Sequence, residues 1–565
     1  MLRGWLALVL LVGCASGGGG GGGTIGKPLH QFPTKQELAA QVIPLSSPLG
    51  AKVIELEGWQ LELPEIDPSS PVHSLVPGLA PGAVASPALD CTSHEIGRIL
   101  LQAPDKMPSL AAMKFISARC HAVVAAPMLR SWSVTVDRSV SDATLIEQLK
   151  ANLKAEAKIN AAEVGIAMVR DQKRAIFVIS HATPQMKVAA ANVFVGTEPA
   201  FRIHGRVSFD ASAVEAYVNV GESSVAMCEL DPSQTLPEFS ASCPVASTDQ
   251  SAWVQVLAVP RGRLISNEVF QAIVLRRPDA ATVYRPRGAG EARPATDSAT
   301  FAAGVLDKLN ERRGQMGLRP LELGREQSDA ASTLTPGLFL ALGRAGSGKD
   351  SSGDLLALGL MAGWDISGGM IRDSRFVLNL SIDTLDADRW LRDLLDLPMG
   401  RAVLLDPNAN ALAIGAAVQA QPPAVAAIAL TYSFFEPEQT PGTQAKQLLQ
   451  RLARLREARN LGTTTMVAEL PDLQPLLSGI HRGAIAPDDA LQSMMQTVVD
   501  KGHQKVQGFV WDTQSLDAIE FPDELLRKGD ITLAAGVTYY KAPDAAWGQY
   551  CVLFVVVDTP HQEEA

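Results

Sequence analysis

Residues 390–418 read WLRDLLDLPMGRAVLLDPNANALAIGAAV, and this stretch decides the fold that we expect. Apolar residues recur at helical spacing from just before this stretch and form one helix face; they are Ala387, Trp390, Leu391, Leu394 and Leu395. A turn at L-L-D-P follows, and residues 413–418 then form an apolar run that contains Gly415. A short apolar run after a turn is typical of a buried strand. The stretch therefore predicts a helix that packs beside a strand, as in an α+β domain.

A second helix is expected upstream, after a suitable N-cap at Thr300 and before a natural stop at Gly317. Its apolar residues recur at i, i+3, i+4 and i+7, and they are Ala302, Val305, Leu306 and Leu309. For the helix of the first stretch, Asp383 or Thr384 is the expected cap. Ordinary core packing accounts for both apolar faces.

The order of these motifs resembles the CAP (SCP/PR-1-like) domain family. The family's closing motif, H-R-x-x-L-L-x-P followed by a Gly-containing strand, corresponds to residues 400–407 and 413–418. Its opening motif, L-N-x-x-R-x-x-x-G-L-x-P-L, corresponds to residues 309–321. The resemblance covers residues 301–435 and implies an α-β-α sandwich.

The same resemblance implies an empty metal site. Many CAP domains hold a divalent cation with two His and two Glu, and the corresponding positions here read Leu334, Gly369 and Gly400. Residues 301–435 contain no histidine, and neither Leu nor Gly offers a side-chain donor. We therefore expect no catalytic residue, no cofactor-binding residue and no metal ligand in this domain.

The first 14 residues are expected to be a lipoprotein signal peptide. Arg3 supplies the positive charge, and residues 5–12 form an apolar core that is too short to span a bilayer. Leu11 to Cys14 resembles a bacterial lipobox, so we expect Cys14 to carry lipid, which anchors the chain to the membrane. The alternative is a plain signal peptide with a chance cysteine. Ala15 rather than Asp follows, which by resemblance to bacterial lipoprotein sorting favours the outer membrane.

Cysteine usage is consistent with an oxidising compartment such as the periplasm or the cell surface. Beyond Cys14, the chain has five cysteines. Two pairs each bracket a short segment, and we expect the disulfides Cys91–Cys120 and Cys228–Cys243. Cys551 lies in an apolar run and is expected to be a buried free thiol.

Three stretches share one design, in which a strand with an early glycine precedes a turn and a longer apolar strand. They are residues 163–180, 411–434 and 533–557. This design is interpreted either as three CAP-like helix-plus-hairpin units or as hairpins that arose independently. Residues 183–276 lack helical periodicity, and their short apolar runs between turn residues favour a β-sandwich.

The expected fold is α+β, with one or more CAP-like α-β-α sandwich domains and an intervening β-sandwich domain. The expected divisions are a signal peptide at 1–14, a Gly/Pro-rich tether at 15–87, a helical-plus-hairpin domain at 88–182, the β-sandwich at 183–276, a linker at 277–298, the CAP-like domain at 299–437 and a C-terminal α+β domain at 443–558. The first and last α+β domains are candidates for degenerate CAP-like units.

Several other chemistries are disfavoured. A net charge of −11 argues against nucleic acid as a partner. Residues 343–350 match G-x-x-x-x-G-K, but Asp350 stands where a P-loop needs Ser or Thr, so we expect a surface loop. His94 and His121 lie near the first cysteine pair and are interpreted as solvated polar residues. The chain contains no H-E-x-x-H motif and no G-x-S-x-G motif.

These observations predict a non-enzymatic envelope lipoprotein that binds or scaffolds an unknown protein, glycan or lipid ligand, needs no cofactor and is anchored by lipid. The alternative is an envelope hydrolase that acts on peptide or peptidoglycan through residues outside the family's set. Converging acid, His or Ser groups in a cleft would favour the hydrolase, and an apolar groove or a flat patch would favour binding.

Overall fold

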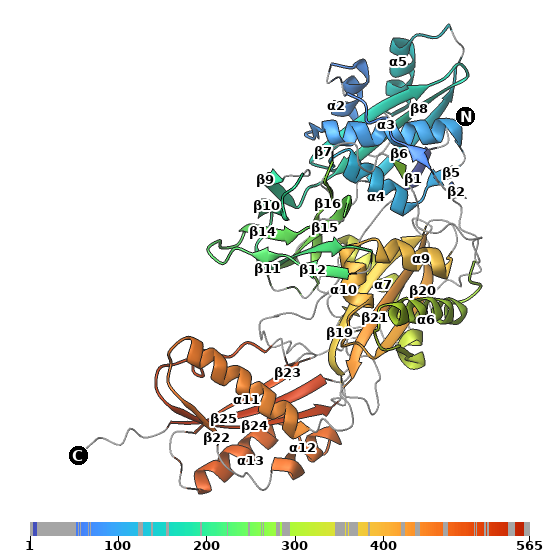
Figure 1. Cartoon of the computed structure of the whole chain (residues 1–565). Helices are drawn as coiled ribbons and strands as arrows, with labels where there is room; N and C mark the ends of the chain where they lie inside the picture. The colour runs from blue at the N-terminus through green and yellow to red at the C-terminus, as the bar shows by residue number, and fades with distance from the viewer. Residues whose placement is uncertain are drawn as a thin grey trace.

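The computed structural model describes residues 4–7 and 52–558. Gaps fall at residues 55, 57, 66, 68, 105, 123–127, 137–138, 154–157, 192–194, 223, 247–248, 262, 264, 278–282, 285–293, 345–355, 358–359, 361–370, 382–384, 420–423, 435–440, 467–472, 502, 504–505, 514–515, 517–518 and 541–548. The fold is α+β, with three units of helices on a sheet and one unit of two sheets (Figure 1).

The middle α+β unit holds the stretch quoted at the outset. In chain order its elements are α6 (Ser298–Gln315), β18 (Glu322–Leu323), α7 (Arg325–Arg344), β19 (Ile371–Ser381), α9 (Ala387–Leu395), α10 (Pro398–Leu404), β20 (Ala411–Gln419) and β21 (Ala424–Phe434). The sheet order is β18-β20-β21-β19, with β18 parallel to β20 and the other pairs antiparallel. Its helices bury apolar residues against both faces of the sheet.

The helix starts of this unit differ from those expected. The N-cap of α6 is Asp297, whose carboxylate accepts from Thr300 N at 2.7 Å, so Thr300 lies inside the first turn. The N-cap of α9 is Asp386, which accepts from Arg389 N at 2.7 Å. In both cases a carboxylate takes the cap because it accepts strongly from the free N–H groups of the first turn.

The first α+β unit begins earlier than expected. Its elements are η2 (Pro71–Leu75), α2 (Val76–Leu79), β4 (Val84–Ala85), α3 (Pro87–Gln102), β5 (Lys106–Pro108), α4 (Leu110–Arg119), β6 (Met128–Thr135), α5 (Asp142–Leu153), β7 (Glu163–Arg170) and β8 (Arg174–Ala182). Val72, Leu75 and Leu79 are buried in its core, because they recur at helical spacing within sequence that composition alone assigned to the tether at 15–87. In addition, β1 (Gly4–Ala7) pairs with β6, although residues 4–7 lie within the expected signal peptide at 1–14. The strand β2 (Lys52–Ile54) pairs with β5.

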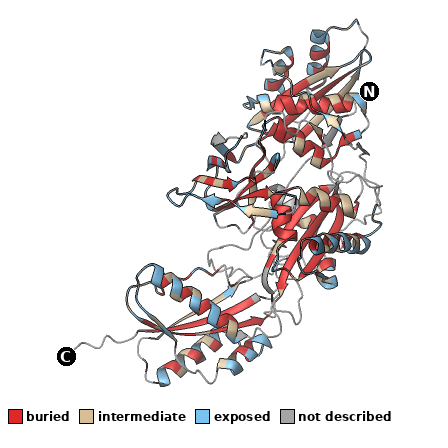
Figure 2. Ribbon diagram, in the orientation of Figure 1, coloured by how far each residue is buried: buried red, intermediate tan, exposed pale blue. Residues whose placement is uncertain are grey.

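The C-terminal α+β unit contains α11 (Pro441–Ala458), β22 (Thr464–Met466), α12 (Leu473–His481), α13 (Pro487–Asp500), β23 (Val506–Thr513), β24 (Ile531–Tyr540) and β25 (Gln549–Asp558). The apolar run at 552–557 is fully buried in β25, at the centre of the sheet, with α11 on one face and α12 and α13 on the other. Figure 2 shows this central strand as buried, while the helices alternate between buried and exposed residues.

The three α+β units share one sheet topology. Each sheet contains a short strand, then the two strands of a hairpin, then a fourth strand, in the orders β4-β7-β8-β6, β18-β20-β21-β19 and β22-β24-β25-β23. In the first sheet, β1 follows β6 as a fifth strand. In each sheet the short strand is parallel to its neighbour, and the other pairs are antiparallel. The hairpins are the three stretches of shared sequence design.

Residues 186–275 form two antiparallel four-stranded sheets. The strands are β9 (Met186–Ala191), β10 (Ala200–Val207), β11 (Ala211–Val220), β12 (Ser224–Met227), β13 (Glu229–Leu230), β14 (Glu238–Pro244), β15 (Ser251–Pro260) and β16 (Asn267–Leu275). The sheet orders are β13-β14-β10-β9 and β12-β11-β15-β16, and both sheets contribute to one apolar cluster. In the predicted linker, β17 (Val283–Tyr284) pairs with β3 (Trp59–Gln60).

Candidate functional site

At the described positions where the CAP resemblance places metal ligands, packed side chains and backbone atoms fill the space. Leu334 lies in α7 and is fully buried in the core. Gly400 lies in α10, where a Cβ atom would come within 1.9 Å of Leu394 O. The backbone of the preceding helix therefore fills the space that a side chain would need. Gly369 lies outside the described residues.

The helix that carries Gly400 is also covered by the two-sheet unit. Every residue of α10 is buried, and it packs on β11, β12 and β15. Arg401, at 1% exposure, donates through Nη1 to Gly221 O and Ser224 O, both at 2.9 Å. Because these bonds satisfy a buried guanidinium across the junction, α10 is fixed to the two-sheet unit.

Two side chains of the two-sheet unit complete this junction. Asn219 Nδ2 donates to Asp396 O at 2.6 Å, and Gln255 Oε1 accepts from Met399 N at 3.0 Å. The free backbone groups around the start of α10 therefore find partners on the neighbouring unit. Tyr217 and Leu257 enter the apolar core of the middle unit beside them.

The arginine of the opening motif has a structural role. Arg313 is fully buried and donates to Arg319 O, Leu404 O and Asp406 O. It thereby joins the end of α6 to the segment that precedes β20. Sequence reasoning missed that the C-terminal unit has an equivalent anchor, Arg456 at the end of α11.

Arg456 is likewise fully buried, and its guanidinium donates to Leu525 O at 2.6 Å and Arg527 O at 3.1 Å. These carbonyls precede β24 as those of Leu404 and Asp406 precede β20. The signal that was available in the sequence is an arginine four residues before the Gly or Asn that ends each helix in a left-handed conformation, Gly317 and Asn460.

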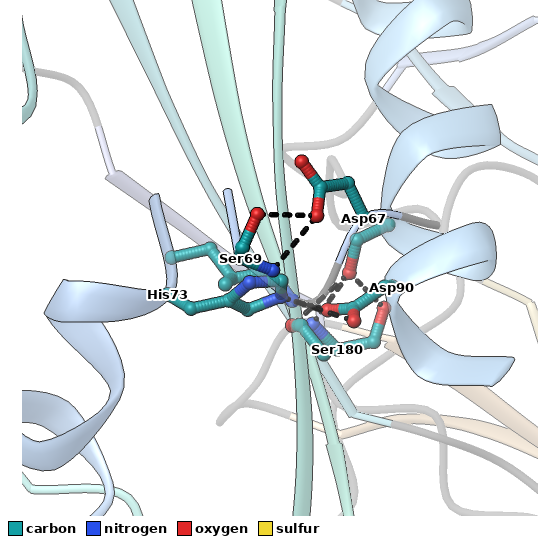
Figure 3. Close-up of polar contacts among 8 residues, drawn as sticks. Asp67, Ser69, His73, Asp90 and Ser180 are labelled. Carbon is teal, nitrogen blue, oxygen red and sulfur yellow. Dashed lines mark hydrogen bonds and ion pairs between the residues drawn. The ribbon is translucent and has the colours of Figure 1, made fainter. Parts of the chain in front are cut away.

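A polar cluster in the first unit brings titratable side chains from η2 and α3 together (Figure 3). His73 Nε2 lies 3.0 Å from Asp90 Oδ2, and Asp90 Oδ1 accepts from Ile166 N at 2.7 Å. Beside them Ser93 donates to Ser180 Oγ at 2.8 Å. Figure 3 also shows Asp67 and Ser69 next to the imidazole, where Ser69 donates to the Asp67 carboxylate at 2.6 Å.

The position of this cluster explains its hydrogen bonds. β4 pairs with β7 only at residues 163–164, so Ile166 N lies at an edge that β4 no longer covers. Asp90 supplies the missing acceptor. In the middle unit, the N–H groups at this edge donate to serine hydroxyls instead. Ser328 accepts from Ile414 N and Ser298 accepts from Ala416 N, both at 3.1 Å. The His73–Asp90 pair therefore stands where the middle unit has an edge cap made of serines.

Burial perturbs several titratable groups of this unit, among them Asp90 and His181. It raises the pKa of the Asp90 carboxyl, which the hydrogen bond from Ile166 N and the proximity of His73 partly offset. Burial and the neighbouring charge of Arg130 lower the pKa of His181 to about 4. Ser69 and His73 share no hydrogen bond among those of the described residues, and His73 Nδ1 is buried without a partner. The cluster thus has an acid–base pair without an activated nucleophile.

The remaining predicted residues fall as follows. The structure contains both expected bridges, Cys91–Cys120 and Cys228–Cys243, and Cys551 is a buried free thiol. Burial raises the pKa of that thiol, which keeps it protonated. Cys14 lies outside the described residues, as does most of the loop at 343–350.

The two histidines near the first bridge have separate surroundings. His94 Nδ1 lies 3.7 Å from Glu95 Oε1, and His121 takes a left-handed turn after α4. In the part of the chain that the structure describes, no three His, Cys, Asp or Glu side chains gather as a metal site would require. No helix among the described residues is long and apolar enough to cross a membrane.

Comparisons with known proteins give no family assignment. No family model matches the sequence, and no curated protein does. Among solved structures, a cysteine-rich secretory protein from Staphylococcus aureus subsp. aureus Mu50 is similar at 10% identity and a TM-score of 0.18, over 44% of this chain and 83% of that one. An extracellular protein containing an SCP domain from Bacillus anthracis str. Ames is similar at 11% identity and a TM-score of 0.19, over 43% and 88%. Likenesses of this size carry no argument about function.

Proposed function

We propose that this chain is a non-enzymatic envelope lipoprotein, anchored to the outer membrane by lipid on Cys14, that binds or scaffolds a partner. In this proposal the middle unit is a degenerate CAP domain, the first and last α+β units are further degenerate copies, and the two-sheet unit is a β-sandwich. No metal and no cofactor takes part. The partner is a protein, a glycan or a lipid of the envelope.

The observation that carries the proposal is the burial of α10. A catalytic cleft has to admit a substrate, yet the helix at the cleft position is covered by the two-sheet unit and held by Arg401. The positions for metal ligands are filled by packing, and the two-sheet unit is hydrogen-bonded to the middle unit. Both features suit a rigid scaffold, in which one unit holds the loops of another in place for binding.

The anchoring is tested by intact-mass analysis and membrane fractionation of the full chain. We expect the mature chain to begin at Cys14 with acyl chains attached, because the lipobox directs both the cleavage before Cys14 and its acylation. We also expect the Cys14→Ser variant to be lost from the membrane fraction. A mature N-terminus elsewhere, or Cys14→Ser that stays with the membrane, would contradict it.

The alternative, an envelope hydrolase, draws on the His73–Asp90 pair, which is an acid–base pair at the start of a helix. Incubation of the full chain with purified peptidoglycan and with an unfolded peptide substrate separates the two functions. We expect no product above a denatured control. Turnover by the wild type that His73→Gln abolishes, with unchanged thermal unfolding, would establish the hydrolase instead.

A further inference from the structure

In the two-sheet unit, the outward face of the sheet β13-β14-β10-β9 has basic residues on one half and acidic residues on the other. β10 is an inner strand of this sheet (Figure 1). Along β10, residues alternate between buried and exposed, and the exposed ones are Arg202, His204 and Arg206. The buried ones, Phe201, Ile203 and Val207, enter the core between the two sheets. The basic side chains therefore share one solvent-facing surface, because alternate residues of a strand point the same way.

Cross-strand pairing extends this surface to the neighbouring strands. Arg206 is paired with Lys187 on β9 and with Glu238 on β14, and Arg202 is paired with Ser242, which is paired in turn with Glu229 on β13. Residues that oppose each other across strands share a face. Lys187, Glu229 and Glu238 are all exposed.

The result is a face with a basic half on β9 and β10 and an acidic half on β13 and β14. Asp231, which follows β13, adds to the acidic half, and its backbone N–H is fixed on Ser240 O at 2.9 Å. Arg206 and Glu238, exposed by 61% and 47% in their side chains, form an ion pair along the line where the halves meet.

We propose that a second copy of this chain docks on this face, through a two-fold axis that runs parallel to β10 and β14. Rotation about such an axis places the basic strands of one copy over the acidic strands of the other, and the reverse holds at the same time. Arg206 of each copy then faces Glu238 of the other. A surface that is complementary to itself in this way is what an isologous dimer requires.

The size of the face sets the strength of this contact. The strands β9, β10, β14 and β13 have 6, 8, 7 and 2 residues. At about 4.8 Å between strands and about 3.3 Å per residue, they give about 360 Å² on each copy. Stable interfaces bury about 800 Å² on each partner, so the dimer is weak and its affinity depends on salt. Confinement of anchored copies to one membrane would raise their effective concentration.

The test is sedimentation velocity of the full chain with Cys14→Ser, at low salt and in about 0.5 M NaCl, where the Debye length is about 4 Å. We expect reversible dimerisation at low salt, weakened at least tenfold at high salt. Two charge variants sharpen the result. Arg202→Glu with Arg206→Glu gives the face a net negative charge, with Lys187 left in place. Glu229→Arg with Glu238→Arg gives it a net positive charge, with Asp231 left in place.

Each charge variant alone is expected to be monomeric, because like charges oppose across the axis, and an equimolar mixture is expected to form a one-to-one heterodimer. Thermal unfolding verifies that each variant is folded. Formation of the heterodimer is a second check, because it requires both variants to be folded. Asp210→Arg with Arg261→Glu, which reverses an exposed ion pair outside this face, is the matched control and should leave association unchanged.

Three results overturn the inference. The wild type stays monomeric at low salt up to the highest soluble concentration. The wild type associates, but neither charge variant weakens it. The two variants do not associate when mixed. Cross-linking from position 202 on intact cells gives a further outcome, since capture of a different envelope protein in place of a second copy would mean that another partner occupies the face.

Discussion

At the scale of single residues, His181 makes the stability of the first unit depend on pH. Burial lowers its pKa from 6.5 to about 4, so the folded state favours the neutral ring. Its contribution is complete above pH 6.5 and is lost as the pH falls toward about 4, which corresponds to about 3 kcal/mol. We expect urea unfolding of His181→Gln to show a flatter dependence over this range. His204→Gln, at an exposed site, should follow the wild type.

A second residue-scale prediction concerns Arg456. Substitution by Met leaves the carbonyls of Leu525 and Arg527 buried without their donor, which is expected to cost about 3 kcal/mol. Denaturant unfolding monitored through Trp511, in the same unit, measures the loss. Arg454→Met, on the exposed side of α11, should change stability by less than about 0.5 kcal/mol. An equal effect of both substitutions would mean that the guanidinium bonds contribute little.

At the scale of elements, α7 and β20 approach so closely that only glycine fits between them. A Cβ atom at Gly415 would lie 2.2 Å from Ser332 N and 2.3 Å from Ala331 C. We expect Gly415→Ala to push the helix from the sheet and to destabilise the chain by about 3 kcal/mol. In Gly314→Ala, within α6, nothing lies within 4 Å of the new atom, so a gain of about 0.5–1 kcal/mol is expected from helix propensity. Thermal unfolding distinguishes the two signs.

Elements with strong local periodicity were predictable from the sequence, and elements that depend on distant partners were not. The helix at 387–395 and the hairpin of β20 and β21 follow from apolar spacing and turn residues, which are local properties. The short helices at 71–79 were missed because prolines around them suggested a tether. The caps Asp297 and Asp386 were misplaced by a few residues, since several nearby residues can serve as caps.

The site was less predictable than the fold. The absence of histidine from residues 301–435 is visible in the sequence, but the covering of α10 by β11, β12 and β15 is not. Arg401 reads as part of a family motif, and its carbonyl partners Gly221 and Ser224 lie far away in the chain. Backbone acceptors carry no signal in the sequence, so contacts of this kind come only from the folded structure.

At the scale of the whole molecule, the junction at α10 should make two units unfold together. Arg401→Met removes the donors to Gly221 O and Ser224 O and is expected to cost about 3 kcal/mol of coupling between the units. Calorimetry should then resolve one broad transition into two. Arg392→Met, which removes an ion pair with Asp388 on the neighbouring α9, should leave a single transition. Two transitions in the wild type would contradict the coupling.

The pairing of β3 with β17 has a consequence for the order of maturation. In the export that we propose, the chain would emerge from its N-terminus onward. The strands β4, β6, β7 and β8, like the four strands of each later α+β sheet, come from one contiguous stretch that can form once it has emerged. Residues 59–60 must wait until residues 283–284 have followed, more than 200 residues later. Trp59, which stacks under the Arg98 guanidinium 5.2 Å from its ring centre, is therefore among the last parts of the first unit to be fixed. Until then Trp59 lacks its partner across the β3–β17 pair, Tyr284.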